Sequence, residues 1–216
     1  MNITSSDIDN QHEYWDKVAD QKTFSHPLNF ELLKKYITKA GSIADFGCGY
    51  GRIVKELLLA GFSNTNGYDI SSQLVRSGVP INLLLQYIYS PQHLPVENNS
   101  VDCILLFAVL TCIPSNNEQI ELIRLLHSKL KPGGILYISD YYLQYNEISK
   151  SRYTYFINDP ENFGVFTLLE GALLRHHTNQ WIDFLIKDFE VMEERLIEVK
   201  TMNGNSAKAF QLIARK

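Results

Sequence analysis

The chain has 216 residues, a length that fits one domain, alone or with a small appendage. Its hydrophobic share of 45% and charged share of 20% are ordinary for a soluble globular protein. The net charge of −4 and the lack of a long basic run argue against a nucleic-acid surface, and no apolar run approaches the roughly 20 residues of a membrane span.

The first residues and the cysteines favour a cytoplasmic protein. Residues 1–7 are polar and acidic, so they are not a signal peptide. The three cysteines, Cys48, Cys103 and Cys112, lack the C-x-x-C spacing of metal ligands, and the sequence predicts no metal site. Free, reduced thiols are the simplest account of them.

The first half of the chain predicts helices and strands in alternation. Residues 10–40 are expected to be helical, in two parts that Pro27 separates, within an N-terminal helical lid over 1–40. A first strand is expected at 42–46. A helix over 52–60 follows, with apolar residues at helical spacing and Gly61 after its last residue.

Further strands and helices continue this alternation. Strands are expected at 66–70, 83–89 and 101–107, and the last of these is a continuous apolar run of the kind buried on both faces. A helix over 116–130 and a turn at 131–134 lead to a fifth strand at 135–139. The pattern predicts an α/β fold, a Rossmann-like parallel sheet with helices on both faces.

The end of the chain departs from this rhythm. Residues 141–187 are expected to form an insertion on the substrate side, rich in aromatic side chains. Residues 189–199 alternate like a strand, and a turn at 202–205 precedes a return strand at 209–214. The sequence therefore predicts a single domain over 1–216 whose sheet ends in an antiparallel hairpin.

The most informative stretch runs from residue 44 to residue 52, where the first strand should feed a helix. Its glycines allow a backbone turn to pass close to a ligand, and the free N–H groups of the helix face that ligand. The carboxylate of Asp45 would repel a pyrophosphate and suits a cationic ligand. The residues of this turn expected to bind a cofactor are Asp45, Gly47, Cys48, Gly49, Gly51 and Arg52.

This stretch resembles motif I of the class I S-adenosylmethionine-dependent methyltransferases. The dinucleotide fingerprint G-x-G-x-x-G differs, because Arg52 stands where its last glycine would be. The likeness is strong over residues 40–140 and rests on pattern alone in the terminal hairpin. It implies S-adenosylmethionine as the cofactor and methyl transfer to a nucleophilic oxygen, nitrogen or sulfur.

The end of the second strand offers a ribose contact. Asp69, followed by Ile70, can accept hydrogen bonds from both ribose hydroxyls of the cofactor. The alternative is a strand-end aspartate that caps the helix beginning near Ser71.

The family resemblance also marks residues on the adenine side. Its usual acidic residue before Leu94-Pro95 is replaced by Ser90, whose hydroxyl accepts hydrogen bonds more weakly. The adenine contact then falls to Ser90, to backbone groups of Pro91 and Gln92, or to His93.

Other aromatic and apolar residues complete the expected cofactor site. Phe107 and Ala108, after the fourth strand, would line its apolar side, and Cys112 would lie near the substrate. Tyr14 and Trp15 resemble the family's N-terminal aromatic pair, which closes over the cofactor, and could equally be core residues.

The substrate side has its sharpest candidates in residues 171–181. Arg175 could contact an anion, and His176 or His177 could act as a general base, with one of the two facing the site. The alternative is a polar loop whose Thr178 caps a helix. Tyr141, at the end of the fifth strand, faces the crevice where ligands bind in such sheets.

These features predict an S-adenosylmethionine-dependent methyltransferase that acts on a small molecule, as a monomer or homodimer. One rival is a protein that binds S-adenosylmethionine or S-adenosylhomocysteine without turnover, because the glutamate and histidine common after the fourth strand are absent. Another is a nicotinamide-dependent oxidoreductase, which the glycine spacing disfavours.

Overall fold

The computed structural model describes residues 11–18, 25–78, 84–168, 171–201 and 204–216. Seven strands form one sheet in the order β3-β2-β1-β4-β5-β9-β8. The first five strands of this order are parallel, whereas β9 runs antiparallel to both β5 and β8. The predicted parallel sheet with a C-terminal antiparallel hairpin is therefore confirmed.

The seven strands differ widely in length. They are β1 (Ile43–Phe46), β2 (Thr65–Asp69), β3 (Leu85–Tyr87), β4 (Val101–Phe107), β5 (Leu130–Tyr141), β8 (Glu190–Lys200) and β9 (Ser206–Arg215). Residues 131–134, predicted as a turn, lie within β5. They form an excursion in it, since Val101 pairs with Leu130 and Cys103 pairs with Ile135.

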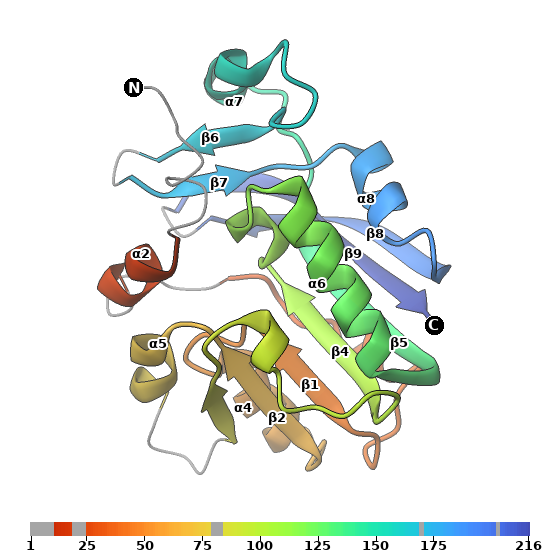
Figure 1. The fold of residues 1–216 in the computed structure, drawn as a ribbon. Helices are drawn as coiled ribbons and strands as arrows, with labels where there is room; N and C mark the ends of the chain where they lie inside the picture. The colour runs from red at the N-terminus through yellow and green to blue at the C-terminus, as the bar shows by residue number, and fades with distance from the viewer. Residues whose placement is uncertain (1–10, 19–24, 79–83, 169–170, 202–203) are drawn as a thin grey trace.

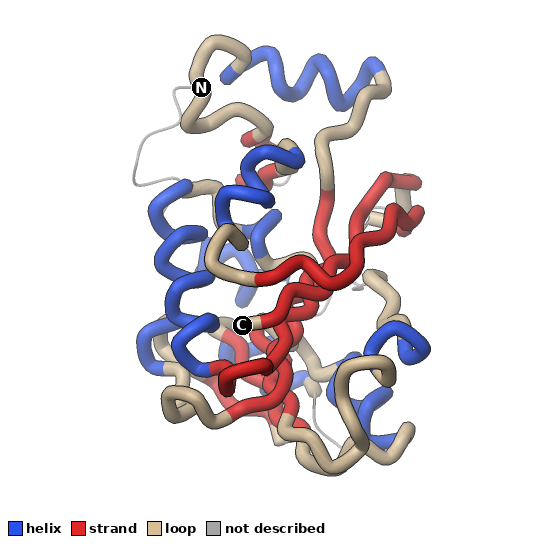
Figure 2. The backbone as a smooth tube through the Cα atoms, turned by 90° about the vertical axis from the view of Figure 1, so that its right-hand side faces the viewer, coloured by secondary structure: helices blue, strands red, loops and turns tan. Residues whose placement is uncertain are grey.

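Helices cover both faces of the sheet, as Figure 2 shows in a side view. They are α2 (Gln11–Val18), α3 (Phe30–Leu33), α4 (Arg52–Leu59), α5 (Ser72–Ser77), α6 (Asn116–Lys129), α7 (Glu147–Tyr153) and α8 (Asn179–Leu185), with short 3-10 turns η1 (Pro91–His93), η2 (Leu110–Cys112) and η3 (Thr154–Phe156). Within the described ranges, no helix combines the length and the apolar character that crossing a bilayer requires.

Alternation along β4 explains the two layers of helices. Ile104 and Leu106 pack in a core that includes residues of α6 and α8, whereas Cys103 and Leu105 pack in a second core with residues of α3 and α4. Successive side chains of a strand point to opposite faces, so an apolar strand must be covered on both.

The prediction of helix over residues 10–40 is only partly right. Residues 19–24 lie outside the described residues, and the second helix is the single turn Phe30–Leu33. Asn29 caps its start by accepting a hydrogen bond from the Leu32 N–H at 3.0 Å. Since Pro27 has no N–H and biases the residue before it against helix, the chain enters α3 as an extended segment.

The first part of the predicted insertion forms a small layer beyond the carboxyl end of β4, where Figure 1 shows α7 above the strands β6 (Val165–Thr167) and β7 (Leu173–Arg175). The last part of the insertion is α8, which packs in the main core. These strands pair antiparallel with each other, apart from the main sheet. The Leu143 N–H donates to His177 O at 2.9 Å, which attaches the layer to the chain leaving β5. The predicted hairpin turn at 202–205 falls partly outside the described residues, which omit 202 and 203.

Candidate functional site

A cavity of about 460 Å³ opens at the carboxyl ends of the parallel strands. This volume lies within the range of small-molecule sites, and the position is where open α/β sheets bind ligands. The cavity brings together many of the residues predicted from sequence: Trp15, Asp45, Gly47, Cys48, Arg52, Asp69, Ile70, Pro91, Phe107, Ala108, Cys112, Tyr141 and His176.

Several other predicted residues do not line this cavity. They are Tyr14, Gly49, Gly51, Ser90, Gln92, Arg175 and His177. Tyr14 packs edge-on against Trp15, with ring centroids 5.1 Å apart. The Ser90 hydroxyl is 2.8 Å from Nδ1 of His93, so the two side chains named for the adenine contact bond to each other.

The glycine turn after β1 packs closely against neighbouring parts of the chain. Gly47 has a φ of 74°, and a Cβ there would lie 2.4 Å from Cγ2 of Val109. Gly51, at the start of α4, has a φ of 79°. The N–H groups of Gly47 and Cys48 both donate to Tyr68 O, at 2.8 and 3.1 Å. The turn is therefore fixed to β2 and leaves no room for a side chain at its first glycine.

Asp69 links the end of β2 to this turn. Its Oδ2 accepts a hydrogen bond from the Gly49 N–H at 2.7 Å, and its Oδ1 accepts one from the Ser71 N–H at 2.8 Å. Ser71 is itself the cap of α5, since its hydroxyl accepts from the Leu74 N–H. Asp69 also lines the cavity, where a carboxylate can accept a hydrogen bond from a ligand hydroxyl.

Asp45 is a buried carboxyl at the end of β1. Only 2% of its surface is exposed, and its Oδ2 has no hydrogen-bond partner among the described residues. Burial raises the pKa of Asp45 to about 8, against the opposing charge of Arg52. A cationic ligand group beside it would supply the missing partner and favour the ionised form.

His26 lines the same cavity and was missed by sequence reasoning. Its Nδ1 lies 2.9 Å from the Ser139 hydroxyl, and its backbone oxygen accepts a hydrogen bond from Arg52. Its Nε2 is buried without a partner in the described part of the chain. Burial, and then the charge of Arg52, lowers the pKa of His26 to about 4, so the ring is neutral at pH 7.

Of the two adjacent histidines, only His176 lines the cavity. Its Nδ1 is 2.6 Å from the Tyr153 hydroxyl, which in turn accepts a hydrogen bond from the Gln144 N–H at 3.0 Å. Burial, and then the charge of Arg152, lowers the pKa of His176 to about 3. A ring with so low a pKa is a poor proton acceptor at neutral pH.

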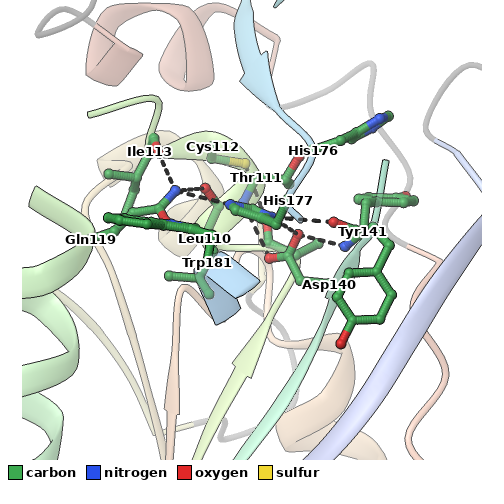
Figure 3. Close-up of polar contacts among 12 residues, drawn as sticks. Leu110, Thr111, Cys112, Ile113, Gln119, Asp140, Tyr141, His176, His177 and Trp181 are labelled. Atoms are coloured by element: carbon green, nitrogen blue, oxygen red, sulfur yellow. Dashed lines mark hydrogen bonds and ion pairs between the residues drawn. The ribbon is translucent and has the colours of Figure 1, made fainter. Parts of the chain in front are cut away.

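His177 is not part of the cavity lining and lies in a network of polar contacts, which Figure 3 shows. Its Nδ1 donates to Tyr141 O at 3.2 Å, which leaves Nε2 to accept from the Gln119 amide nitrogen at 3.0 Å. The Gln119 amide oxygen accepts from Trp181 Nε1 at 2.7 Å. Burial, and then the charge of Arg175, lowers the pKa of His177 to about 3. These contacts give His177 a structural position, and its predicted role as a base remains without support from this geometry.

Arg175 also points away from the cavity. Its guanidinium donates to Pro114 O at 3.0 Å, bonds to the Asn116 side chain, and lies 5.1 Å from the ring of Trp181. Thr178 caps α8 by accepting from the Trp181 N–H at 3.1 Å, so the alternative interpretation of this segment holds for its last part.

The segment after β4 forms the apolar side of the cavity. Ala108 has a φ of 54°, a left-handed conformation that is uncommon for a residue other than glycine. The Cys112 thiol donates to Ala108 O at 3.2 Å, and burial raises the pKa of this thiol well above its usual range. A thiol in that state is not an activated nucleophile, which agrees with a packing role.

Comparison with known proteins accords with this geometry. A family model described as "Methyltransferase domain" matches residues 15–183, which is more than half of the chain. A structure of an S-adenosylmethionine-dependent methyltransferase from Methanosarcina mazei is 26% identical, with a TM-score of 0.78, and the match covers 87% of this chain and 98% of that one. No curated protein matches the chain at a significant level.

Two more distant structures share the fold. One is the 1,6-didemethyltoxoflavin-N1-methyltransferase of Burkholderia thailandensis with bound 1,6-didemethyltoxoflavin and S-adenosylhomocysteine (15% identity, TM-score 0.62, covering 86% of this chain and 75% of that one). The other is the cyclase SpnF (14% identity, TM-score 0.64, covering 95% and 94%). The fold, the glycine turn and the family match agree: the chain belongs to the methyltransferase-domain family of class I proteins, and its cofactor is S-adenosylmethionine.

Proposed function

We propose that the protein transfers a methyl group from S-adenosylmethionine to a small-molecule nucleophile. The observation that supports this most is that one continuous cavity joins two sets of residues. The glycine turn, Asp45 and Asp69 lie at one part of its wall, and side chains from residues 141–176 and from the β8–β9 hairpin lie at another. A donor and a small acceptor can therefore share one enclosed space.

The residues at the strand ends suit this cofactor. The glycine turn lines the cavity beside Asp69, whose carboxylate can accept hydrogen bonds from the ribose hydroxyls. The unpartnered Asp45 oxygen suits the cationic amino end, and Phe107 and Ala108 offer apolar contact. Trp15 also lines the cavity, which supports the N-terminal segment as a cover over it.

When bound, S-adenosylmethionine supplies a methyl group already activated by a positively charged sulfur. The chain's contribution is then mainly to align the acceptor and to exclude water. The neutral rings of His26 and His176 each have one nitrogen held by a hydroxyl group, at 2.9 and 2.6 Å. These contacts fix the orientation of both rings in the cavity wall.

The test is to incubate the purified protein with S-adenosylmethionine and a panel of phenols, carboxylates, amines and thiols. Mass spectrometry should detect S-adenosylhomocysteine together with one methylated class of acceptor. Cofactor binding in calorimetry without any product would instead favour the second candidate, a protein that binds the cofactor without turnover. One observation speaks for that candidate: the segment Leu110–Cys112 after β4 has no acid or imidazole.

A further inference from the structure

The outer part of the cavity holds a cation from α7. Arg152 lines the cavity together with Ile148 of the same helix, and both side chains are also exposed to solvent. The guanidinium carbon of Arg152 lies 5.5 Å from the ring centroid of Phe166, a cation–π contact. Such stacking holds the planar guanidinium while its N–H donors stay available at its edge.

A row of rings leads inward from Arg152. Phe166 lies 4.7 Å from His176, His176 lies 5.2 Å from Tyr141, and Tyr141 lies 4.6 Å from His26, measured between ring centroids. All four of these rings line the cavity. A continuous row of aromatic rings therefore runs along the cavity wall from Phe166, beside α7, past the end of β5 to His26.

The inner end of this row lies beside the glycine turn. The backbone oxygen of His26 accepts a hydrogen bond from Arg52, the first residue of α4. Arg152 and the glycine turn therefore lie at opposite ends of this row of rings.

Among the residues that the structure describes, no carboxylate offsets the positive charge of Arg152 in the outer part of the cavity. The other acidic or basic side chains, histidines aside, that the structure describes in the cavity wall are Asp45, Asp69 and Arg52, all next to the glycine turn. No carboxylate of the described residues pairs with Arg152, and the nearby Glu147 pairs instead with Lys150 at 3.2 Å. His176 adds no charge at neutral pH, because its pKa is lowered to about 3.

We propose, on the basis of the proposed methyl transfer, that Arg152 binds an anionic group of the acceptor. The acceptor class that fits is an elongated aromatic carboxylate. Its carboxylate would meet the guanidinium edge in a two-point contact, and its body would lie along the ring wall formed by Phe166, His176 and Tyr141. The nucleophile is then a different group at the opposite end of the molecule, near His26.

The test uses matched ligands and variants on protein saturated with S-adenosylhomocysteine. The ligands are para-hydroxy, para-amino and para-thiol derivatives of benzoate and phenylpropanoate, each paired with its primary amide. Binding is measured by calorimetry and thermal shift for wild type, Arg152→Gln and Arg152→Lys. Arg124→Gln removes an exposed arginine of α6 outside the cavity wall and serves as the control.

At least one acid should bind wild type about tenfold more tightly than its amide does. Arg152→Gln should remove that preference, Arg152→Lys should keep part of it, and Arg124→Gln should leave it unchanged. The inference is overturned if no acid binds, if acid and amide bind equally, or if Arg152→Gln keeps the preference. An acid that binds through Arg152 yet yields no methylated product refutes methyl transfer to that ligand and leaves the anion site standing.

Discussion

The Oδ2 of Asp69 accepts a hydrogen bond from the Gly49 N–H at 2.7 Å, which ties the end of β2 to the glycine turn after β1. The same carboxylate therefore fixes the turn and faces the cavity. A substitution at this position should affect both the shape of the turn and the proposed ribose contact.

Asp69→Asn tests that double role with little change in volume. The asparagine has only one acceptor oxygen for two backbone donors and the ribose, so cofactor affinity should fall about tenfold or more, with a loss of about 1–2 kcal/mol in unfolding free energy. Calorimetry with S-adenosylmethionine and urea denaturation measure the two effects.

Asp102→Asn is the matched control. Asp102 lies near the start of β4, where it accepts from the Ser42 N–H at 2.8 Å and pairs with Lys131 at 2.8 Å. The Asp102→Asn variant should be less stable than wild type and should bind the cofactor with unchanged affinity. If Asp69→Asn binds the cofactor within twofold of wild type, the ribose assignment is wrong.

Asp45 should make cofactor binding depend on pH. Its pKa of about 8 means that the free protein holds it protonated at neutral pH, whereas a cationic ligand group favours the carboxylate. Affinity should therefore rise with pH from 6 to 8, by up to about tenfold per unit, and level off above pH 8. Calorimetry in buffers of different ionisation enthalpy should detect proton release on binding.

Asp45→Asn separates this effect from other titrating groups. The variant should bind more weakly at pH 8 and show a flatter profile. A wild-type affinity that stays constant between pH 6 and 8 would contradict the placement of a cationic group beside Asp45.

His177 should contribute to loss of stability in acid. Its folded pKa of about 3 lies below the value of 6.5 of an unperturbed imidazole, so the unfolded chain binds its proton first as pH falls. The stabilisation from the neutral ring is complete above about pH 6.5 and is lost progressively below it. Between pH 7.5 and 5.0 the loss amounts to about 2 kcal/mol.

The measurement compares His177→Gln with wild type by urea denaturation at both pH values. Asp45 and Asp140, whose pKa values burial raises to about 8 and about 7, act in the opposite direction and are present in both proteins. The variant is expected to be less stable than wild type at pH 7.5. On acidification to pH 5.0, its unfolding free energy should fall by about 2 kcal/mol less than that of wild type. An equal loss in both proteins would rule out this role.

Gly47 and Gly133 are a matched pair of positions at which to measure how much stability is lost when alanine replaces glycine. Their φ angles are 74° and 78°, but a Cβ at Gly47 meets Val109 at 2.4 Å, whereas one at Gly133 has nothing within 4 Å. Both alanine variants place a side chain on a left-handed backbone, which is strained. The unfolding free energy of Gly47→Ala should fall by about 1–3 kcal/mol more than that of Gly133→Ala, because of the clash with Val109. Only Gly47→Ala should also weaken cofactor binding in calorimetry. Equal effects of the two substitutions would show that the turn is not tightly packed.

The succession of strands and helices along the chain could be predicted because local patterns specify it. The apolar run of β4, the glycine turn after β1 and the terminal alternation each depend on neighbouring residues in the sequence. The small hairpin β6–β7 could not, since its strands have three residues each and too little periodicity to recognise.

The residues of the candidate site also fall into those that local sequence motifs identify and those that depend on contacts between distant segments. Asp45 and Asp69 belong to short motifs, whereas His26 reaches the cavity wall through contacts with Ser139 and Tyr141, more than 100 residues away. Strand alternation predicts that one of the two histidines faces the site, and only His176 of the pair lines the cavity. It could not reveal that Arg175 would turn toward Pro114 and Trp181, because those partners come from other elements.

A crystal structure with S-adenosylhomocysteine tests the placement of the cofactor most directly. The ribose hydroxyls should lie within hydrogen-bond distance of the Asp69 carboxylate, and the sulfur should face the wall that contains His26 and Tyr141. A ligand whose sugar lies away from Asp69, or that binds outside this cavity, would contradict the account.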